Sequence, residues 1–443
     1  MMKMKKIAAL ASVGAIALGG FAACSSSGSS SADGKGKVYF LNWKPEQEQA
    51  FKAIAQEYSK AKGVDVKVVT AASGTYEQTL KSEISKSDAP TLFQINGPVG
   101  LASWNKYALD LTDTPLVKSL KDPNLALKGE DGKVYGTPAA VEGYGIIYNK
   151  AIMDKYFGLE GAKAKSMDEI KGFDKLKEVA DDMQAKKAEL GIDGVFASTS
   201  LASGEDWRWQ THLSNIPMYY EYKDAGVTDE KTVTFKYNEN FKKLFDLYLT
   251  DSTVEKTLTP SKTVTDSMAE FAQGKAAMVQ NGNWAWSQIK DVSGNVVKEE
   301  NIKFLPMYTG VPGEEKQGLA VGTEAFMAVN KKASEADQKA TLDFMNWLYT
   351  DDAGKKHVIN DLGFIAPYSN YAEADTPKDP LAKEIATYIS NKDLYAVPWV
   401  FTTYPSQKFK DDFGQALAQY ASGNLDWPKV VSTFVDGWAA EKK

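Results

Sequence analysis

The feature that most constrains the fold is a strand, helix, strand pattern over residues 38–69. Residues 38–41 form a short apolar run typical of a buried strand, and the valine-rich residues 64–69 also indicate a strand. Between them, apolar side chains recur on one face of a predicted helix: Phe51, Ile54, Ala55 and Tyr58. A unit of this length favours two parallel strands joined by a right-handed helical crossover. The sequence therefore predicts an α/β fold, in which ligands bind beyond the carboxyl ends of the strands.

Two candidate binding residues follow strands of this kind. Trp43 comes directly after the first strand, and Asn96 comes after a further predicted strand at residues 91–95. We therefore expect both side chains at the same edge of the sheet, where a ligand would bind. Large aromatic side chains also dominate core burial, so the sequence leaves open whether Trp43 binds a ligand or fills the core.

A second informative segment, residues 267–286, predicts a helix, a short buried strand, a turn and a second helix. Asn281 and Gly282 have the composition of the turn. Trp284 and Trp286 lie in the first turn of the second helix. Each is either an aromatic platform for a ligand or core, and helical spacing does not decide between the two.

Two motifs carry a resemblance to a known family. Residues 274–286 contain Gly-Lys-Ala-Ala-Met followed by Asn-Gly-x-Trp-Ala-Trp, and residues 135–150 read Tyr-Gly-Thr-Pro-Ala-Ala-Val-Glu-Gly-Tyr-Gly-Ile-Ile-Tyr-Asn-Lys. In this order they resemble the extracellular sugar-binding proteins of ATP-binding-cassette importers, the maltose-binding-protein-like family 1 solute-binding proteins. The resemblance places Glu142 at a position that often faces the sugar in that family.

The resemblance also implies the fold class. This is an α/β, two-lobed periplasmic-binding-protein-like fold, in which each lobe is a mostly parallel sheet flanked by helices and a three-segment hinge joins the lobes. The implied N-terminal lobe comprises residues 37–143 and 318–363, and the implied C-terminal lobe comprises residues 144–317 and 364–443.

The start of the chain predicts export. Residues 1–23 resemble a secretory signal peptide, because three lysines precede an apolar run that is too short for a stable membrane anchor. Cys24 follows two alanines and is the only cysteine in the chain, so we expect it to be the lipidated first residue of a bacterial lipoprotein. A chance cysteine in an ordinary signal is the alternative. Residues 24–36 then predict a flexible tether that holds the protein at the bacterial cell surface, on the outer face of the cytoplasmic membrane.

Charge and composition exclude several classes of function. The net charge of −6 argues against nucleic acid as a partner, and against contact with anionic lipid other than through the anchor. The two histidines are far apart in sequence and no Cys/His ligand spacing occurs, so no metal site is expected. The chain also lacks a P-loop and a dinucleotide fingerprint, and we expect no cofactor.

A sugar site needs flat aromatic side chains for the C–H faces of the rings and planar polar groups for the hydroxyls. The aromatic candidates are Trp43, Trp207, Trp209, Trp284 and Trp399. The polar candidates are Asn96, Glu142, Asp206, Arg208 and Asn281. Arg208 is the only arginine, and its guanidinium suits ligand binding. A surface ion pair with Asp206 or Glu205 is the alternative for this side chain.

These features predict a monomeric lipoprotein that captures an oligosaccharide between two lobes and delivers it to the membrane permease of an ATP-binding-cassette importer. It is expected to have no catalytic residues. The alternative is a secreted, lipid-anchored enzyme acting on polysaccharide, which needs only two suitably spaced carboxylates. A receptor for a peptide, polyamine or metal would need a convergent charge cluster, which the sequence does not indicate.

Overall fold

The computed structural model describes residues 34–72, 74–198, 200–372 and 374–442. The expected signal peptide, Cys24 and most of the expected tether therefore lie outside the described residues. Within them, no helix is long and apolar enough to cross a membrane.

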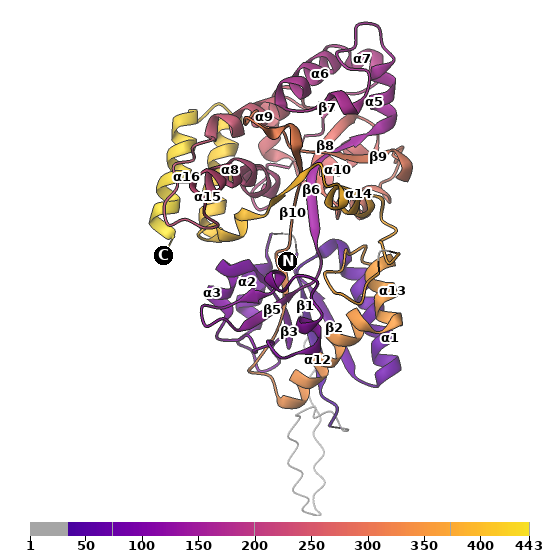
Figure 1. Cartoon of the computed structure of the whole chain (residues 1–443), viewed down its shortest axis with the longest axis vertical. Helices are drawn as coiled ribbons and strands as arrows, with labels where there is room; N and C mark the ends of the chain where they lie inside the picture. The colour runs from indigo at the N-terminus through magenta and orange to yellow at the C-terminus, as the bar shows by residue number, and fades with distance from the viewer. Residues whose placement is uncertain (1–33, 73, 199, 373, 443) are drawn as a thin grey trace, which may run out of the picture.

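The chain forms two lobes, each built on one sheet with helices packed against it (Figure 1). The first sheet has the order β2-β1-β3-β11-β5-β4, and the second has the order β12-β10-β6-β8-β7, with β9 also paired to β6. The first-sheet strands are β1 (Lys37–Asn42), β2 (Asp65–Thr70), β3 (Leu92–Asn96), β4 (Leu127–Lys128), β5 (Val134–Pro138) and β11 (Ala325–Val329). The second-sheet strands are β6 (Glu142–Asn149), β7 (Gly194–Phe196), β8 (Ala276–Gly282), β9 (Ile302–Leu305), β10 (Gln317–Gly322) and β12 (Tyr395–Pro398).

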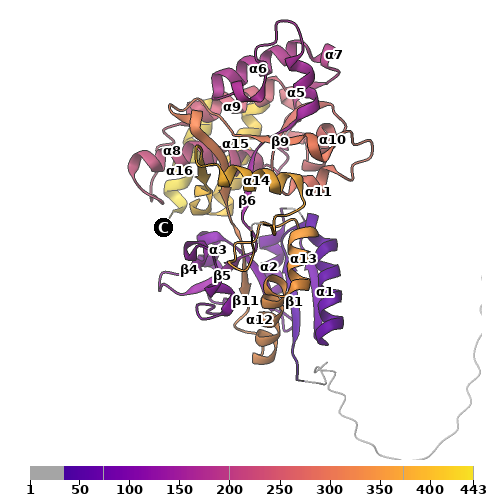
Figure 2. The same cartoon turned by 45° about the vertical axis from the view of Figure 1, so that its right-hand side comes forward.

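Helices cover both sheets, and Figure 2 shows α13 of the first lobe opposite α11 of the second. The first lobe carries α1 (Glu48–Lys62), α2 (Tyr76–Glu83), α3 (Gly97–Trp104), α4 (Pro115–Lys118), α12 (Glu335–Thr350) and α13 (Asp352–Asn360). The second lobe carries α5 (Lys150–Phe157), α6 (Phe173–Ala185), α7 (Lys187–Leu190), α8 (Ser214–Ala225), α9 (Asn238–Thr250), α10 (Val264–Ala272), α11 (Ala285–Ile289), α14 (Pro380–Ser390), α15 (Gln407–Ala421) and α16 (Trp427–Glu441).

The predicted strand, helix, strand unit is confirmed. β1 pairs with β2 in parallel along its whole length, and α1 forms the crossover between them. The predicted apolar face of α1 is buried. Gly63 ends this helix with a φ of 67°, a left-handed conformation that glycine adopts without strain. β3 joins the other side of β1, also in parallel, so Trp43, which directly follows β1, and Asn96, which ends β3, lie at the ends of neighbouring strands.

The two-lobed α/β fold is confirmed, but the sheets are more mixed than the expected mostly parallel ones. β6 pairs in antiparallel fashion with β8, β9 and β10, and β11 does so with β3 and β5. The reason is topological: β6 and β11 enter their lobes from the connection between the lobes. They therefore run against neighbours whose carboxyl ends point toward that connection.

Three segments connect the lobes. Residues 139–141 join β5 to β6, and residues 323–324 join β10 to β11. Val141 also pairs with Ile365 of the third segment, so two of the connections lie side by side. The return to the first lobe comes later than the expected boundary at residue 318, because β10 pairs with β6 and β12 of the second sheet.

The third connection also comes later than the expected boundary at residue 364. Apolar side chains beyond that boundary pack into the first-lobe core: Phe364, Ala366, Tyr368 and Tyr371. In extended chain, alternate residues point to the same side, which places residues 364, 366 and 368 together. The second lobe resumes with α14, whose Leu381 joins a second-lobe core cluster.

The predicted turn at Asn281 and Gly282 is wrong. Both residues belong to β8, where they pair with Gly145 and Tyr144 of β6. The long cross-strand ladder overrides the local preference of an Asn-Gly pair for a turn. The second helix, α11, then begins at Ala285 with Trp284 at its cap.

Candidate functional site

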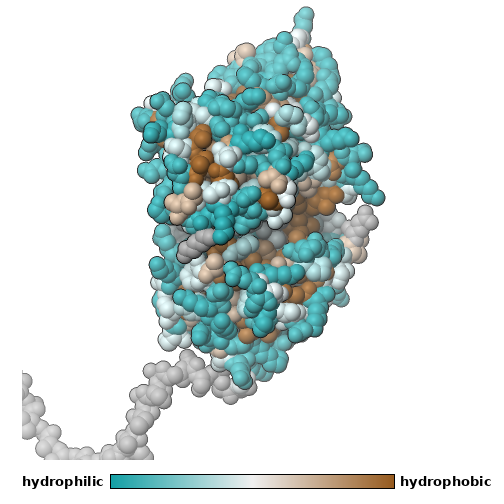
Figure 3. Space-filling view, turned by 60° about the vertical axis from the view of Figure 1, so that its left-hand side comes forward, coloured by the Kyte–Doolittle hydropathy of each residue, from teal (hydrophilic) through white to brown (hydrophobic). Residues whose placement is uncertain are grey.

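The candidate site lies at the waist, which we define as the region where the two lobes face each other beside the connecting segments. Figure 3 shows apolar side chains gathered in the hollow of the waist, whereas the surrounding surface is mostly hydrophilic. The lobes touch across it. A methyl group added to Gly97 of the first lobe would lie 3.2 Å from Cβ of Thr402 in the second. One added to Gly74 would lie 2.7 Å from the carbonyl oxygen of Gly204. The structure is therefore a closed form.

Trp43 and Asn96 lie on the first-lobe side of the waist, as their positions at the strand ends predicted. The half-buried Trp43 ring stacks on Tyr76, with ring centres 5.5 Å apart and planes 18° apart. Its backbone N–H donates to Oε1 of Gln94 at 2.7 Å. Asn96 is half-buried and immediately precedes α3, whose Gly97 approaches the second lobe.

Lys44 and Glu142 connect the two lobes by an ion pair. Nζ of Lys44 lies 2.7 Å from Oε1 of Glu142 and 3.9 Å from Oε1 of Glu46. Burial lowers the pKa of the Lys44 ammonium, but the two carboxylates outweigh burial and leave this pKa above its usual value. Nζ of Lys44 also lies 5.5 Å from the centre of the Trp284 ring, within the range of a cation–π contact.

Trp284 and Trp286 have different environments although they are two residues apart. Trp284 is half-buried, and its ring lies against Gly282, where an added methyl group would be 2.2 Å from the indole. Its centre is 5.6 Å from that of the His212 ring. Trp286 is 8% exposed and belongs to a core cluster. Trp284 thus remains a candidate platform, whereas Trp286 is core.

Arg208 and Asn281 are hydrogen-bonded to each other on the second-lobe side of the waist. Nη2 of Arg208 donates to Oδ1 of Asn281 at 3.1 Å. Burial lowers the pKa of the guanidinium to about 10, which nearby carboxylates only partly oppose. The alternative ion pair with Asp206 or Glu205 does not occur among the described residues. Asp206 is instead buried, and burial raises the pKa of its carboxyl to about 7.

Trp207 and Trp209 flank Arg208 but point to different places. Nζ of Lys410, on α15, lies 4.7 Å from the centre of the half-buried Trp207 ring. Trp209 is 1% exposed and makes edge-to-face contacts with Phe245 and Tyr248 in the second-lobe core. Its expected role as a ligand platform is therefore wrong. Residues Arg208–Leu213 form a π-helical turn with Trp207 at its cap, and side chains two positions apart on a helix do not face each other.

Trp399 belongs to a buried aromatic cluster behind Trp284. Its ring lies 5.5 Å from that of Tyr144, which in turn stacks on His212 at 4.2 Å. Trp399 packs over Gly322 at the end of β10, where an added methyl group would be 2.5 Å from Cγ of the indole. Trp399 therefore stands beside the candidate site but is only 7% exposed.

The structure adds polar residues that were not among the predicted site residues: Lys44, Glu46, Tyr144, His212, Glu324 and Lys410. Glu324 lies on the connection between β10 and β11. Burial raises the pKa of its carboxyl to about 7, although Lys410 and Lys44 lower it. Lys410 is itself buried, and burial lowers the pKa of its ammonium. Among these residues, only Lys44 had a signal in the sequence. It directly follows Trp43 and therefore lies at the same strand end.

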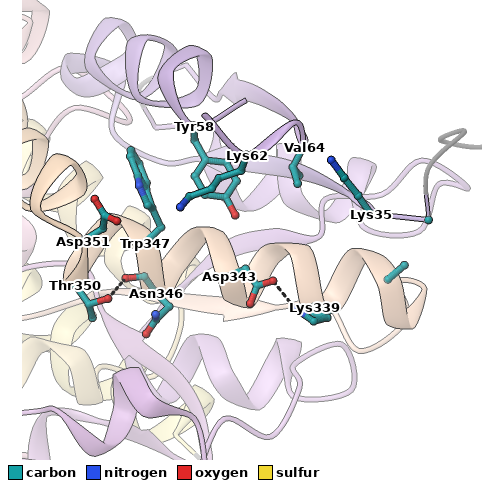
Figure 4. Close-up of a pocket in the computed structure, with 12 residues that line it drawn as sticks. Lys35, Tyr58, Lys62, Val64, Lys339, Asp343, Asn346, Trp347, Thr350 and Asp351 are labelled. Atoms are coloured by element: carbon teal, nitrogen blue, oxygen red, sulfur yellow. Dashed lines mark hydrogen bonds and ion pairs between the residues drawn. The ribbon is translucent and has the colours of Figure 1, made fainter. Parts of the chain in front are cut away.

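Two cavities bear on where the site lies. One of about 200 Å³ lies between the lobes and is lined by Gln47, Glu142 and Trp284, among others. A larger one, of about 700 Å³, lies on the first lobe between α1 and α12 (Figure 4). Its walls carry Tyr58, Trp347 and several charged side chains, but none of the predicted site residues. Among the described residues, no group of histidine, cysteine or carboxylate side chains is arranged to hold a metal ion.

Comparison with known proteins gives consistent results. A model of the family "Bacterial extracellular solute-binding protein" matches residues 53–384. The chain is 25% identical over 437 residues to the multiple sugar-binding protein of Streptococcus mutans, covering 94% of this chain and 93% of that protein. It is 25% identical over 417 residues to the maltodextrin-binding protein MdxE of Bacillus subtilis, covering 90% and 86%. The solved structure of RafE in complex with raffinose has a TM-score of 0.70 at 19% identity, covers 92% of this chain and 100% of that chain, and therefore shares the fold.

Proposed function

This chain belongs to the bacterial extracellular solute-binding proteins, and on that basis we propose that it captures an oligosaccharide in the cleft between its two lobes. The observation that carries the proposal is that both lobes contribute half-buried aromatic rings near the waist. Trp43 comes from the first lobe, and Trp207 and Trp284 come from the second. Aromatic faces suit the C–H faces of sugar rings. The sugar-binding names of the relatives support the same ligand class.

Charged and polar groups beside these rings would bind the hydroxyls. We propose that Glu142 and Arg208 contact the sugar directly, with Asn96 and Trp399 at the margins of the site. Asn281 is fully buried and holds Arg208, so we assign it a positioning role. Ionised groups form the stronger hydrogen bonds to hydroxyls, which favours Glu142 and Arg208 as the main polar contacts.

The proposal includes release to the permease of an ATP-binding-cassette importer and a non-enzymatic role. Relatives named as binding proteins support the latter. We further propose that the protein acts as a monomer. The extracellular family supports export.

We propose that the protein is anchored through a lipid on Cys24. Labelled palmitate should appear on the wild-type protein, which should fractionate with membranes. Cys24→Ala should be released. Equal membrane association of the two would contradict the anchor.

The test of ligand class is calorimetric titration of the purified protein with raffinose, stachyose and maltotriose. A dipeptide and spermidine serve as controls for the peptide and polyamine classes. We expect saturable binding of at least one saccharide and none of either control. Failure to bind any of the three saccharides would overturn the proposed function, and binding of a control would favour the peptide or polyamine class instead. Product analysis after prolonged incubation with the bound saccharide should find it intact, and cleavage would favour an enzyme instead.

A further inference from the structure

Three buried side chains next to the candidate site have polar atoms without a hydrogen-bond partner among the described residues. These atoms are the hydroxyl of Tyr144, Nδ1 of His212 and Nε1 of Trp399. The side chains belong to residues that are 0%, 4% and 7% exposed, respectively. Buried polar atoms in folded proteins nearly always have partners, because an unpartnered one loses its hydrogen bonds to water. Three of them on side chains that pack around the Tyr144 ring therefore require an explanation.

The three side chains come from different elements and meet at the end of β10. Tyr144 lies on β6 opposite Ala320 of β10, and Trp399 follows β12 and packs over Gly322. The Tyr144 ring is 4.2 Å from the His212 ring and 5.5 Å from the Trp399 ring. The cluster thus stands where β10 leaves the second sheet for the first lobe.

Further unpartnered atoms extend this cluster toward the cleft. Thr323 and Glu324 follow β10 directly, and Oγ1 of Thr323 and Oε2 of Glu324 are also buried without a partner. On the other side, the His212 ring is 5.6 Å from the half-buried ring of Trp284. A sugar ring stacked on Trp284 would therefore lie near side chains that carry these unpartnered atoms.

The protonation states of the cluster indicate which ligand chemistry it fits. Burial, reinforced by the charges of Arg208, Lys410 and Lys44, lowers the pKa of His212 well below 6.5, so its imidazole is neutral. Burial raises the pKa of Tyr144 well above 10, so its hydroxyl is intact. A neutral imidazole, a phenol and an indole N–H offer both donors and acceptors but no charge. Sugar hydroxyls, which also donate and accept, match this set better than a carboxylate or an ammonium does.

We propose that Tyr144, His212 and Trp399 form a polar subsite that binds the hydroxyls of an uncharged sugar ring stacked on Trp284. This inference rests on the proposed function and assigns specificity-determining residues to it. The subsite makes the empty protein less stable than it would be without these atoms. Ligand hydroxyls then supply the missing partners, so the same atoms favour the bound form.

The chain offers a matched control for the test. The hydroxyl of Tyr248 is also buried without a partner, but its ring packs against Phe196 and Trp209 in the second-lobe core. Tyr144→Phe and Tyr248→Phe therefore remove the same atom from two buried places. Only the first place adjoins the candidate site.

Thermal unfolding and calorimetric titration of both variants, with whichever of raffinose, stachyose and maltotriose the wild type binds, test the subsite. Both variants should melt at or above the wild-type temperature, because each loses an unsatisfied buried hydroxyl. Tyr144→Phe should bind the saccharide roughly tenfold more weakly, and Tyr248→Phe should bind it as the wild type does.

Wild-type affinity in Tyr144→Phe would overturn the subsite while leaving the proposed function intact. Equal weakening in both variants would also overturn it, because the effect would then not belong to the site. If the wild type binds none of the three saccharides, the proposed function fails, and the subsite fails with it.

Discussion

Nζ of Lys44 lies 2.7 Å from Oε1 of Glu142, so an ammonium of the first lobe is bound by a carboxylate at the first residue of a second-sheet strand. The side chains of the pair are 13% and 4% exposed. The same ammonium faces Trp284 at 5.5 Å. The Lys44 ammonium thus lies over the Trp284 ring, on which we expect a sugar to stack. Its ion pair with Glu142 also joins the two lobes.

Removal of the ammonium should therefore shift the open–closed equilibrium of the empty protein toward the open form. In Lys44→Met, closure would bury the Glu142 carboxylate without its partner, whereas opening returns that carboxylate to water. We expect a larger radius of gyration by small-angle scattering, with the melting temperature changed by only a few degrees. The charge-swapped double variant, Lys44→Glu with Glu142→Lys, should restore the wild-type radius. An unchanged radius in Lys44→Met would mean that this ion pair does not maintain closure.

Trp284 and Trp286 should respond oppositely to truncation. Loss of a stacking ring in Trp284→Ala should weaken saccharide binding by roughly 1 to 3 kcal/mol, by analogy with bases stacked on aromatic side chains. Trp286→Ala removes a core residue and should lower the free energy of unfolding by roughly 3 to 5 kcal/mol. Titration and thermal unfolding of both variants separate the two effects. Normal affinity together with early melting in Trp284→Ala would identify this ring as core.

Closure itself can be tested at two glycines that face each other. Both Gly74 and Gly204 have positive φ, at 71° and 81°, so alanine strains the backbone at either position. Only at Gly74 does the added methyl group meet the opposite lobe, 2.7 Å from the Gly204 carbonyl oxygen. At Gly204 nothing lies within 4 Å. We expect Gly74→Ala, but not Gly204→Ala, to weaken saccharide binding several-fold and to enlarge the liganded radius of gyration. Equal behaviour of the two variants would argue against contact between the lobes at this point.

Saccharide binding should take up protons through Glu324. Burial in the closed form raises the pKa of this carboxyl from 4.5 to about 7, and an open cleft returns it to water. The closed form therefore binds the proton more tightly between these pH values. Affinity should rise as the pH falls from about 8 to about 5, because closure of the ionised form is penalised at the higher pH.

Titrations in buffers of different ionisation enthalpy measure this uptake directly. Glu324→Gln should abolish it. Asp206→Asn is the matched control, because burial also raises the pKa of Asp206 to about 7, but the groups that influence it, Gln210 and Asp411, belong to its own lobe. Uptake that persists in Glu324→Gln would assign the proton to another group.

Local patterns predicted the fold well where local contacts determine it. The buried face of α1 followed from helical periodicity, because one side of the helix faces the first-lobe core along its length. The turn at Asn281 and Gly282 was mispredicted, because pairing with β6 is a long-range interaction that the Asn-Gly pair does not encode.

The site was predicted less completely, for a related reason. Trp209 has the same residue type and sequence neighbourhood as Trp207, and only the orientation of the helical turn distinguishes the core residue from the half-buried one. Lys410 lies within the helical pattern of α15, and its proximity to Trp207 depends on two segments about 200 residues apart in sequence. Contacts of this kind have no local signature, whereas Lys44 shared the strand-end position that had identified Trp43.

The two lobes contribute unequal numbers of stacking rings to the site. This affects the order of saccharide contact and lobe closure. Trp207 and Trp284 both belong to the second lobe, while the first contributes Trp43 and Lys44. A saccharide can therefore meet most of its stacking surface before the lobes come together. Its association rate then depends on the second lobe alone, whereas its residence time depends on the first lobe, which must withdraw before the ligand escapes. We therefore expect substitutions at Trp43 or Lys44 to change how long a sugar stays, and substitutions at Trp284 to change how readily it arrives as well.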